Sequence, residues 1–213
     1  EMCIRDRYMT PTESAAAKPQ LITPTFVLAW VANFCQFLVF YLFVTTMALY
    51  AVESFGASDT VGGFASSAFV LGATCMRVFS GWIVDRVGHK KAALASLAFV
   101  TLVAVAYFFA HNVAVLIIVR MVHGAAYALT STALMAVAQS VIPHERRAEG
   151  TGYFALGTTL ATAFGPAIGL LLANNIGYTT LFAVALGANI VSLILALVLR
   201  YPAEVSSEKP AFK

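Results

Sequence analysis

Two ionisable residues, Arg120 and His123, lie inside a long apolar run of this sequence. Gly124, Tyr127 and Ser131 follow at helical spacing, so an α-helix would place all of them on one face. A charged side chain inside a membrane is costly and should face protein or a water-filled cavity. This face is therefore the best candidate for lining a polar path. Alternatively, Arg120 pairs with backbone carbonyls and His123 is a neutral hydrogen-bonding group.

The composition indicates a membrane protein. Of the 213 residues, 60% are hydrophobic and 11% are charged, whereas a soluble domain carries about 25% charged residues. A spanning helix needs roughly 20 mostly apolar residues. Runs of this length cover residues 25–52, 60–84, 92–110, 113–142, 149–173 and 179–199. Because the runs are long and do not alternate, they predict an all-α membrane protein, a six-transmembrane-helix bundle, and not a barrel.

Lysine and arginine are distributed unevenly about these runs. If the chain crosses the membrane six times, every lysine and arginine outside a span falls on the same side of the membrane. The loops on the other side, near 53–59, 111–112 and 174–178, have none. The positive-inside rule then predicts that both ends of the chain are cytoplasmic. Arg77 and Arg120 fall within spans; Arg77 could reach the cytoplasmic interface or pair within the bundle. No basic patch suggests nucleic acid.

A charged loop bounded by glycines joins the second and third runs. Asp85 ends the second run, where a carboxylate faces the negative end of the helix dipole and needs a partner, for which Arg86 and Lys90 are local candidates. Gly81 would let a neighbouring helix approach closely, and Gly88 would permit a tight turn. The loop resembles the signature of the major facilitator superfamily, G-x-x-x-D-R-x-G-R-[RK], at Gly81, Asp85, Arg86, Gly88 and Lys90. His89 departs from that pattern, and the alternative is an ordinary cytoplasmic loop.

Two further segments are similar to motifs of the same superfamily. The run from Arg120 to Gly124 resembles its R-x-x-x-G motif, which implies a role for Arg120 in proton coupling or in contact with a substrate anion. A stripe of small residues with a proline resembles its antiporter motif, G-x-x-x-G-P-x-x-G-G, at Gly157, Ala161, Gly165, Pro166 and Gly169. Ala161 and Leu170 stand where that motif has glycine. Antiport, and hence export, is favoured; the alternative is plain helix packing.

The resemblance implies the amino-terminal half of a twelve-span transporter, built from 3+3 inverted repeats, in the drug:proton antiporter branch. The loop at 81–90 would then act as a conformational switch between the two halves. The implied partners are the lipid bilayer, a small-molecule substrate, protons, and a missing carboxy-terminal six-helix half or a second copy. The implied location is a bacterial cytoplasmic (inner) membrane, with no cofactor. Proton-coupled uptake is the alternative within the superfamily.

Two alternatives from other classes are a six-span membrane enzyme and a six-span protein that dimerises through the face at 165–169. Neither G-x-S-x-G nor H-E-x-x-H occurs in the sequence. The cysteines show no metal-ligand spacing, so no metal site is expected.

The first run supplies Asn33 and Gln36, which can share one face and are candidate substrate contacts. No span carries a carboxylate at mid-membrane, since Asp85 and Glu149 lie at the cytoplasmic boundary. A coupling proton would therefore use His123, a group in a missing half, or another mechanism.

The expected domain organisation has four parts. Residues 1–8 look like the translation of a transposon-end sequencing adapter, so the native start is expected at Met9. Residues 9–24 form a cytoplasmic segment, 25–200 the six-helix domain, and 201–213 the start of a cytoplasmic central linker. We expect the 213 residues alone not to transport, because half of the binding site would be absent.

Overall fold

Each apolar run of the sequence forms a helix, which confirms the predicted all-α bundle. The computed structural model describes residues 20–199. The elements are α1 (Pro24–Phe55), α2 (Asp59–Val87), α3 (His89–Ala106), the short helix η1 (Tyr107–Phe109), α4 (Val113–Val141), the short helix η2 (His144–Arg146), α5 (Arg147–Asn175) and α6 (Tyr178–Val198). Within the described range, six helices are long and apolar enough to cross a membrane. The predicted parts at 1–8 and 201–213, and most of 9–24, lie outside the described residues.

Local sequence signals explain where the helices begin and end. Thr23 caps α1 by accepting a hydrogen bond from the Phe26 amide at 3.1 Å, and Asn112 caps α4 by accepting one from the Val115 amide at 2.9 Å. Gly88 separates α2 from α3 with φ of 90°, a conformation that a side chain disfavours. The tight turn predicted at Gly88 is therefore confirmed.

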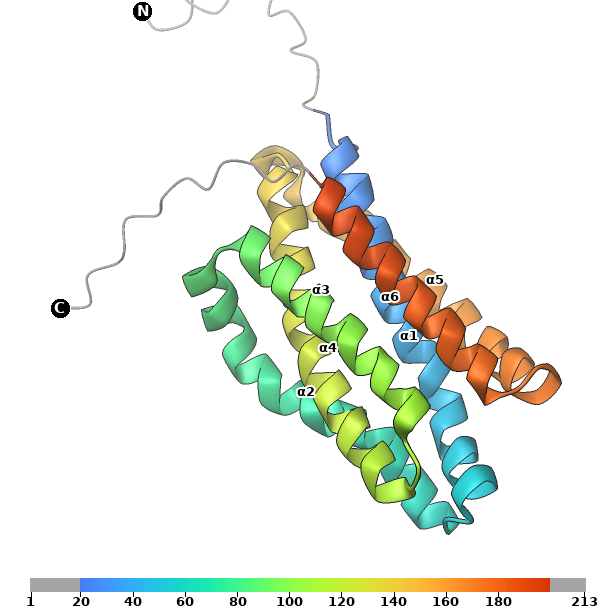
Figure 1. Ribbon diagram of the computed structural model, residues 1–213. Helices are drawn as coiled ribbons and strands as arrows, with labels where there is room; N and C mark the ends of the chain where they lie inside the picture. Colours follow the sequence, from blue (N-terminus) through green and yellow to red (C-terminus); the bar gives the residue numbers. More distant parts are fainter. Residues whose placement is uncertain (1–19, 200–213) are drawn as a thin grey trace, which may run out of the picture.

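The charged connections gather at one end of the bundle. The α2–α3 and α4–α5 connections lie at the same end as the start of α1 and the end of α6, whereas the other three connections lie opposite (Figure 1). We call the first the charged end, because it carries Arg86, Lys90, Lys91, Arg146 and Arg147. We call the other the opposite end.

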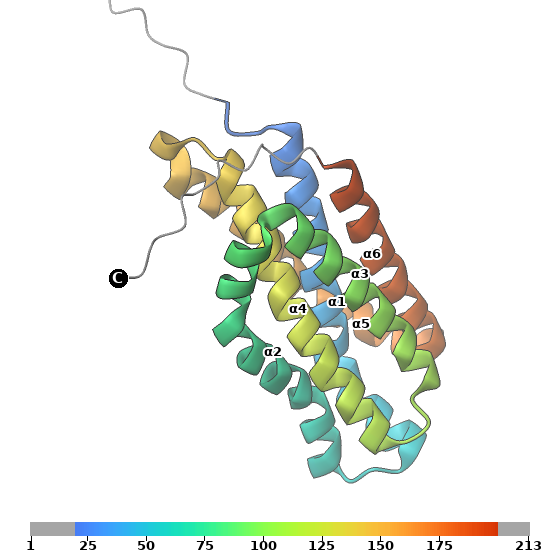
Figure 2. The ribbon, with the colours of Figure 1, turned by 60° about the vertical axis from the view of Figure 1, so that its left-hand side comes forward.

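The packing relates the first three helices to the last three. The main contacts of α4 are with α2 and α3, and the main contacts of α1 are with α5 and α6. Exchanging α1 with α4, α2 with α5 and α3 with α6 maps one set of contacts onto the other, as expected for two three-helix repeats. The α2 and α6 helices lie at opposite sides of the bundle (Figure 2).

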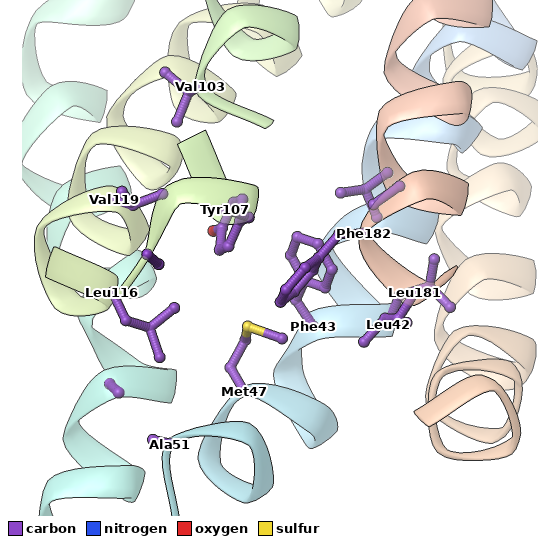
Figure 3. Packing of buried hydrophobic residues seen from close by; sticks show 14 residues of the cluster. Leu42, Phe43, Met47, Ala51, Val103, Tyr107, Leu116, Val119, Leu181 and Phe182 are labelled. Atoms are coloured by element: carbon purple, nitrogen blue, oxygen red, sulfur yellow. The ribbon is translucent and has the colours of Figure 1, made fainter. Parts of the chain in front are cut away.

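The largest apolar core lies toward the opposite end. Leu42, Phe43 and Met47 of α1 meet Leu116 of α4 and Phe182 of α6, all with at most 4% exposure (Figure 3). Tyr107 of η1 reaches into the same cluster, and its ring centroid lies 4.9 Å from that of Phe43. This core joins both repeats, so it fixes the helices that surround the cavity described next.

Candidate functional site

A cavity of about 270 Å³ lies between helices of both repeats. Two of the lining helices come from the first repeat, α1 and α2, and two from the second, α4 and α5. The lining residues are Asn33, Phe37, Arg77, Ser131, Thr132, Met135, Phe154, Ala155 and Thr158. The cavity therefore combines one cation and several hydroxyl or amide groups with an apolar wall.

Arg77 brings the charge into this cavity from α2. It lies about 15 Å along the helix from the end of α2 at Val87, and its side chain is exposed. Among the described residues its guanidinium has neither a hydrogen-bond nor an ion-pair partner. The sequence left two alternatives for Arg77, reaching the cytoplasmic interface or pairing within the bundle. The second is not seen among the described residues. The sequence marked Arg77 as a lone arginine in an apolar run. It could not predict the cavity, because the lining helices are distant from one another in the chain.

Arg120 occupies a different place, buried between α4 and α2 with 0% exposure. Its Nε donates to the Ala65 carbonyl at 3.4 Å and its Nη2 to the Ser66 carbonyl at 2.9 Å. The guanidinium carbon lies 4.9 Å from the ring centroid of Phe69. Its Nη1 is buried without a hydrogen-bond partner. This is the backbone-paired arrangement, and Arg120 does not line the cavity.

His123 is also buried, at 2% exposure, and is hydrogen-bonded. The Tyr107 hydroxyl lies 2.9 Å from its Nδ1, so the pair joins α4 to η1. Tyr127, further along α4, packs among aromatic rings, with ring centroids 5.6 Å from Phe37 and 5.2 Å from Phe69. The sequence predicted that one face of α4 lines a polar path. Of the residues on that face, Ser131 lines the cavity, whereas Arg120, His123 and Tyr127 pack inside the bundle.

Gly124 allows α2 and α4 to cross at very short distance. A Cβ on Gly124 would collide with the backbone carbonyl of Phe69, and a Cβ on Gly72 would collide with that of Met121. The two glycines therefore form one close crossing, directly beside Arg120 and His123. The sequence motif pointed to Gly124 but not to Gly72, because a single glycine in a helix carries no spacing signal.

The small-residue stripe of α5 packs against α1 of the same chain. A Cβ on Gly165 would lie 2.5 Å from Cβ of Tyr41, and one on Gly169 would lie 2.6 Å from the Leu42 carbonyl oxygen. Gly157 faces the Trp30 ring, where an added Cβ would lie 3.3 Å away. Pro166 sits within α5, which continues through it. Dimerisation through the face at 165–169 is therefore wrong, because α1 already covers that face.

Asn33 and Gln36 of α1 have different surroundings. Asn33 lines the cavity with 3% exposure, and its amide has no hydrogen-bond partner among the described residues. Gln36 instead donates to the Asn189 side chain at 2.9 Å, and Ser192 donates to the Ala32 carbonyl at 2.9 Å. The Gln36 side chain thus belongs to the contact between α1 and α6.

The charged loop lies outside the cavity, at the charged end. Within the described part of the chain, Arg86 makes no ion pair with Asp85, and its guanidinium carbon lies 5.3 Å from the ring centroid of Trp82. Among the described residues no helix approaches Gly81 closely, since an added Cβ would meet no described atom within 4 Å. Lys90 begins α3 with His89. No cluster of metal-ligating residues occurs in the range 20–199.

Comparison with known proteins adds the family. The model of the Major Facilitator Superfamily matches residues 29–213. An uncharacterised protein of Mycobacterium tuberculosis is 35% identical over 124 residues, which cover 58% of this chain and 29% of the relative. The staphylopine export protein of Staphylococcus aureus is 31% identical over 133 residues, covering 62% and 32%.

The multi-drug resistance efflux pump PmrA of Streptococcus pneumoniae is 29% identical over 161 residues, covering 73% of this chain and 39% of the pump. The matched part of this chain thus spans about a third of the length of these curated relatives.

Proposed function

The chain belongs to the major facilitator superfamily, and on this premise we propose that it forms part of a secondary transporter that exports small molecules by alternating access. The observation that carries the proposal is the cavity shared by α1, α2, α4 and α5. Superfamily members bind substrate near the membrane midplane and expose the site by rocking one unit against another. A cavity lined by both repeats suits such a site.

A motif resemblance and the names of two relatives support export over uptake. The small-residue stripe of α5 resembles an antiporter motif, and it packs closely against α1, the helix that carries Asn33 into the cavity. Two relatives bear names that state export or efflux. We therefore favour export of a solute and keep uptake as the alternative direction.

Among the described residues, we propose His123 as the group that takes up the coupling proton. The five carboxylates of the described residues lie near helix ends, at Glu53, Asp59, Asp85, Glu145 and Glu149. None of them lines the cavity. His123 is hydrogen-bonded to Tyr107 and lies one helical turn from Arg120, so a proton taken up there would change the charge beside a buried guanidinium. Such a change could bias the α2–α4 crossing at Gly124.

A second six-helix unit would complete the path. The helices α2 and α5 flank the cavity and carry exposed apolar residues, such as Val78 at 76%, Phe79 at 58% and Leu171 at 57% exposure. We propose that this unit is a carboxy-terminal half or a second copy, and that the loop with Asp85 acts at the boundary between the units. The charged end would face the cytoplasm of a bacterium.

Deletion of the gene in the cell that carries it tests the function. Cells lacking the gene should accumulate more of at least one dye in a panel of fluorescein, ethidium and Hoechst 33342 than cells complemented with the wild type. Ala155→Trp fills the cavity and should fail to complement. Leu197→Trp, on the exposed side of α6 at 64% exposure, is the matched control and should complement. Equal accumulation in all strains would contradict the proposal.

A further inference from the structure

The cavity holds a positive charge without a counter-charge. Arg77 lines it, and among the described residues no carboxylate lies within the middle of any helix. A charged side chain inside the membrane is costly, and such residues usually pair with another group. The described helices place no anionic partner beside Arg77. A bound anion would therefore supply the missing counter-charge in the cavity.

Neutral polar groups surround the same position. The Asn33 amide is 97% buried and unpaired among the described residues, while it faces the cavity. The hydroxyls of Ser131, Thr132 and Thr158 line it from α4 and α5. A guanidinium offers a planar fork of donors that fits carboxylate or phosphate oxygens, and nearby hydroxyl and amide donors extend such a site.

The remaining wall is apolar. Phe37 of α1, Met135 of α4 and Phe154 of α5 line the cavity beside the polar groups. A fully hydrated inorganic anion would gain nothing from this wall. An organic anion would gain on both sides, because its acidic group would meet Arg77 and its hydrocarbon part would meet the aromatic and thioether side chains.

We infer that the cavity binds amphipathic organic anions, with the acidic group held by Arg77 and Asn33 and an aromatic or aliphatic body held against Phe37, Met135 and Phe154. This inference rests on the proposed function, because it names the substrate class of the same cavity. It separates this protein from an exporter of lipophilic cations, whose cavity would present carboxylates to the substrate.

Two other anions could reach Arg77. One is the phosphate of an anionic lipid, which shares the chemistry of an organic acid. The other is a carboxylate of a protein segment outside the described residues. Each gives a result different from that of a bound solute, so a single set of variants separates the three.

A pair of probes that differ in charge and share one shape provides the test. We would measure binding of 2-naphthoate and 2-naphthamide to the full chain in phosphatidylcholine nanodiscs by ligand-observed NMR. The wild type should bind naphthoate at least about tenfold more tightly than naphthamide. Arg77→Gln should weaken naphthoate binding roughly tenfold to hundredfold, the range expected for hydrogen bonds to a charged group, and leave naphthamide unchanged.

Two further variants make the result specific. Arg77→Lys keeps the charge and should retain most of the preference for naphthoate. Arg147→Gln, which removes an arginine at the charged end outside the cavity, should leave the preference intact. Circular dichroism of each variant checks that the helices persist. If Arg77→Gln binds naphthamide as tightly as the wild type does, the cavity itself is intact.

Three results would overturn the inference. The first is equal or absent binding of the two probes by the wild type, as expected if a protein carboxylate already occupies Arg77. The second is a preference that survives Arg77→Gln. The third is phosphatidylglycerol that copurifies with the wild type and is lost in Arg77→Gln, which would assign the site to a lipid. The dye-accumulation assay is independent of the binding assay. Equal dye accumulation in all strains, together with a retained preference for naphthoate, would reject transport but keep the anion site.

Discussion

The Tyr107 hydroxyl lies 2.9 Å from Nδ1 of His123, in a part of the bundle where both side chains are almost fully buried. The bond ties η1, at the end of the first repeat, to α4, the first helix of the second repeat, beside Arg120. Because both groups are buried, the hydroxyl and Nδ1 satisfy each other's need for a hydrogen-bond partner.

The first prediction concerns this bond. Tyr107→Phe removes the hydroxyl and leaves Nδ1 of His123 without that partner, which should cost about 1–3 kcal/mol of unfolding free energy. Equilibrium unfolding in mixed micelles measures it. Tyr178→Phe is the control, because it removes an exposed hydrogen bond to Glu53 and should cost less. Equal losses in the two variants would contradict the importance of burial at His123.

The second prediction concerns the α2–α4 crossing. Gly124→Ala would drive a methyl group into the Phe69 carbonyl, so the helices must separate, at a cost of about 1–3 kcal/mol or more. Gly63→Ala is matched, since a Cβ there meets no described atom within 4 Å and alanine is the better helix former. Thermal unfolding in detergent compares them. A Gly124→Ala protein as stable as Gly63→Ala would show that the crossing is not tightly packed.

Much of this architecture could be predicted from the sequence, but only what depends on local pattern. Six long apolar runs fix six helices, since length and hydropathy suffice in a membrane. Gly88 could be placed in a turn because it lies between a charged loop and an apolar run. The side of α4 that carries Arg120 was also readable from helical spacing.

The sequence could not predict which residues those side chains contact. Arg120 reaches the carbonyls of Ala65 and Ser66, which lie 55 and 54 residues away in the chain. Its burial depends on Gly72 and Gly124, which bring α2 close enough to accept its hydrogen bonds. Arg77 enters the cavity because four helices converge there, a relation that no single segment contains. The positions of the site residues thus depend on tertiary packing, whereas the positions of the helices could be predicted from local sequence alone.

The third prediction separates stability from transport at Arg120. Arg120→Met keeps a side chain of similar length and removes a buried charge whose Nη1 has no hydrogen-bond partner, so the lost hydrogen bonds are offset by the removed cost of burying the charge. We expect the unfolding free energy to change by no more than the net contribution of one hydrogen bond, about 0.5–1.5 kcal/mol. We expect dye export in the complementation assay to be lost, because the charge beside His123 is gone. Full export by Arg120→Met would contradict a role of this charge in coupling.

The fourth prediction concerns the contact between α1 and α6. Gln36→Leu and Asn189→Leu each leave one buried amide without its partner, whereas the double variant removes both. Interhelical hydrogen bonds in membranes give coupling energies of about 0.6 kcal/mol on average and 1.7 at most. A double-mutant cycle on unfolding free energy should give a value in this range.

Binding of 2-naphthoate should be unchanged in all three of these variants, because Gln36 does not line the cavity. A large loss of binding in Gln36→Leu, with stability retained, would instead make Gln36 a substrate contact.

The fifth prediction concerns orientation. If the charged end faces the cytoplasm, a cysteine at position 91 is protected in intact cells, and one at position 59, at the start of α2, is reached from outside. Lys91→Cys and Asp59→Cys, each in a background with Cys3, Cys35 and Cys75 changed to alanine, should therefore differ in labelling by a membrane-impermeant maleimide. Labelling of both after lysis is the control. The reverse pattern in intact cells would place the lysines and arginines outside, and the proposed direction of export would have to be reversed with it.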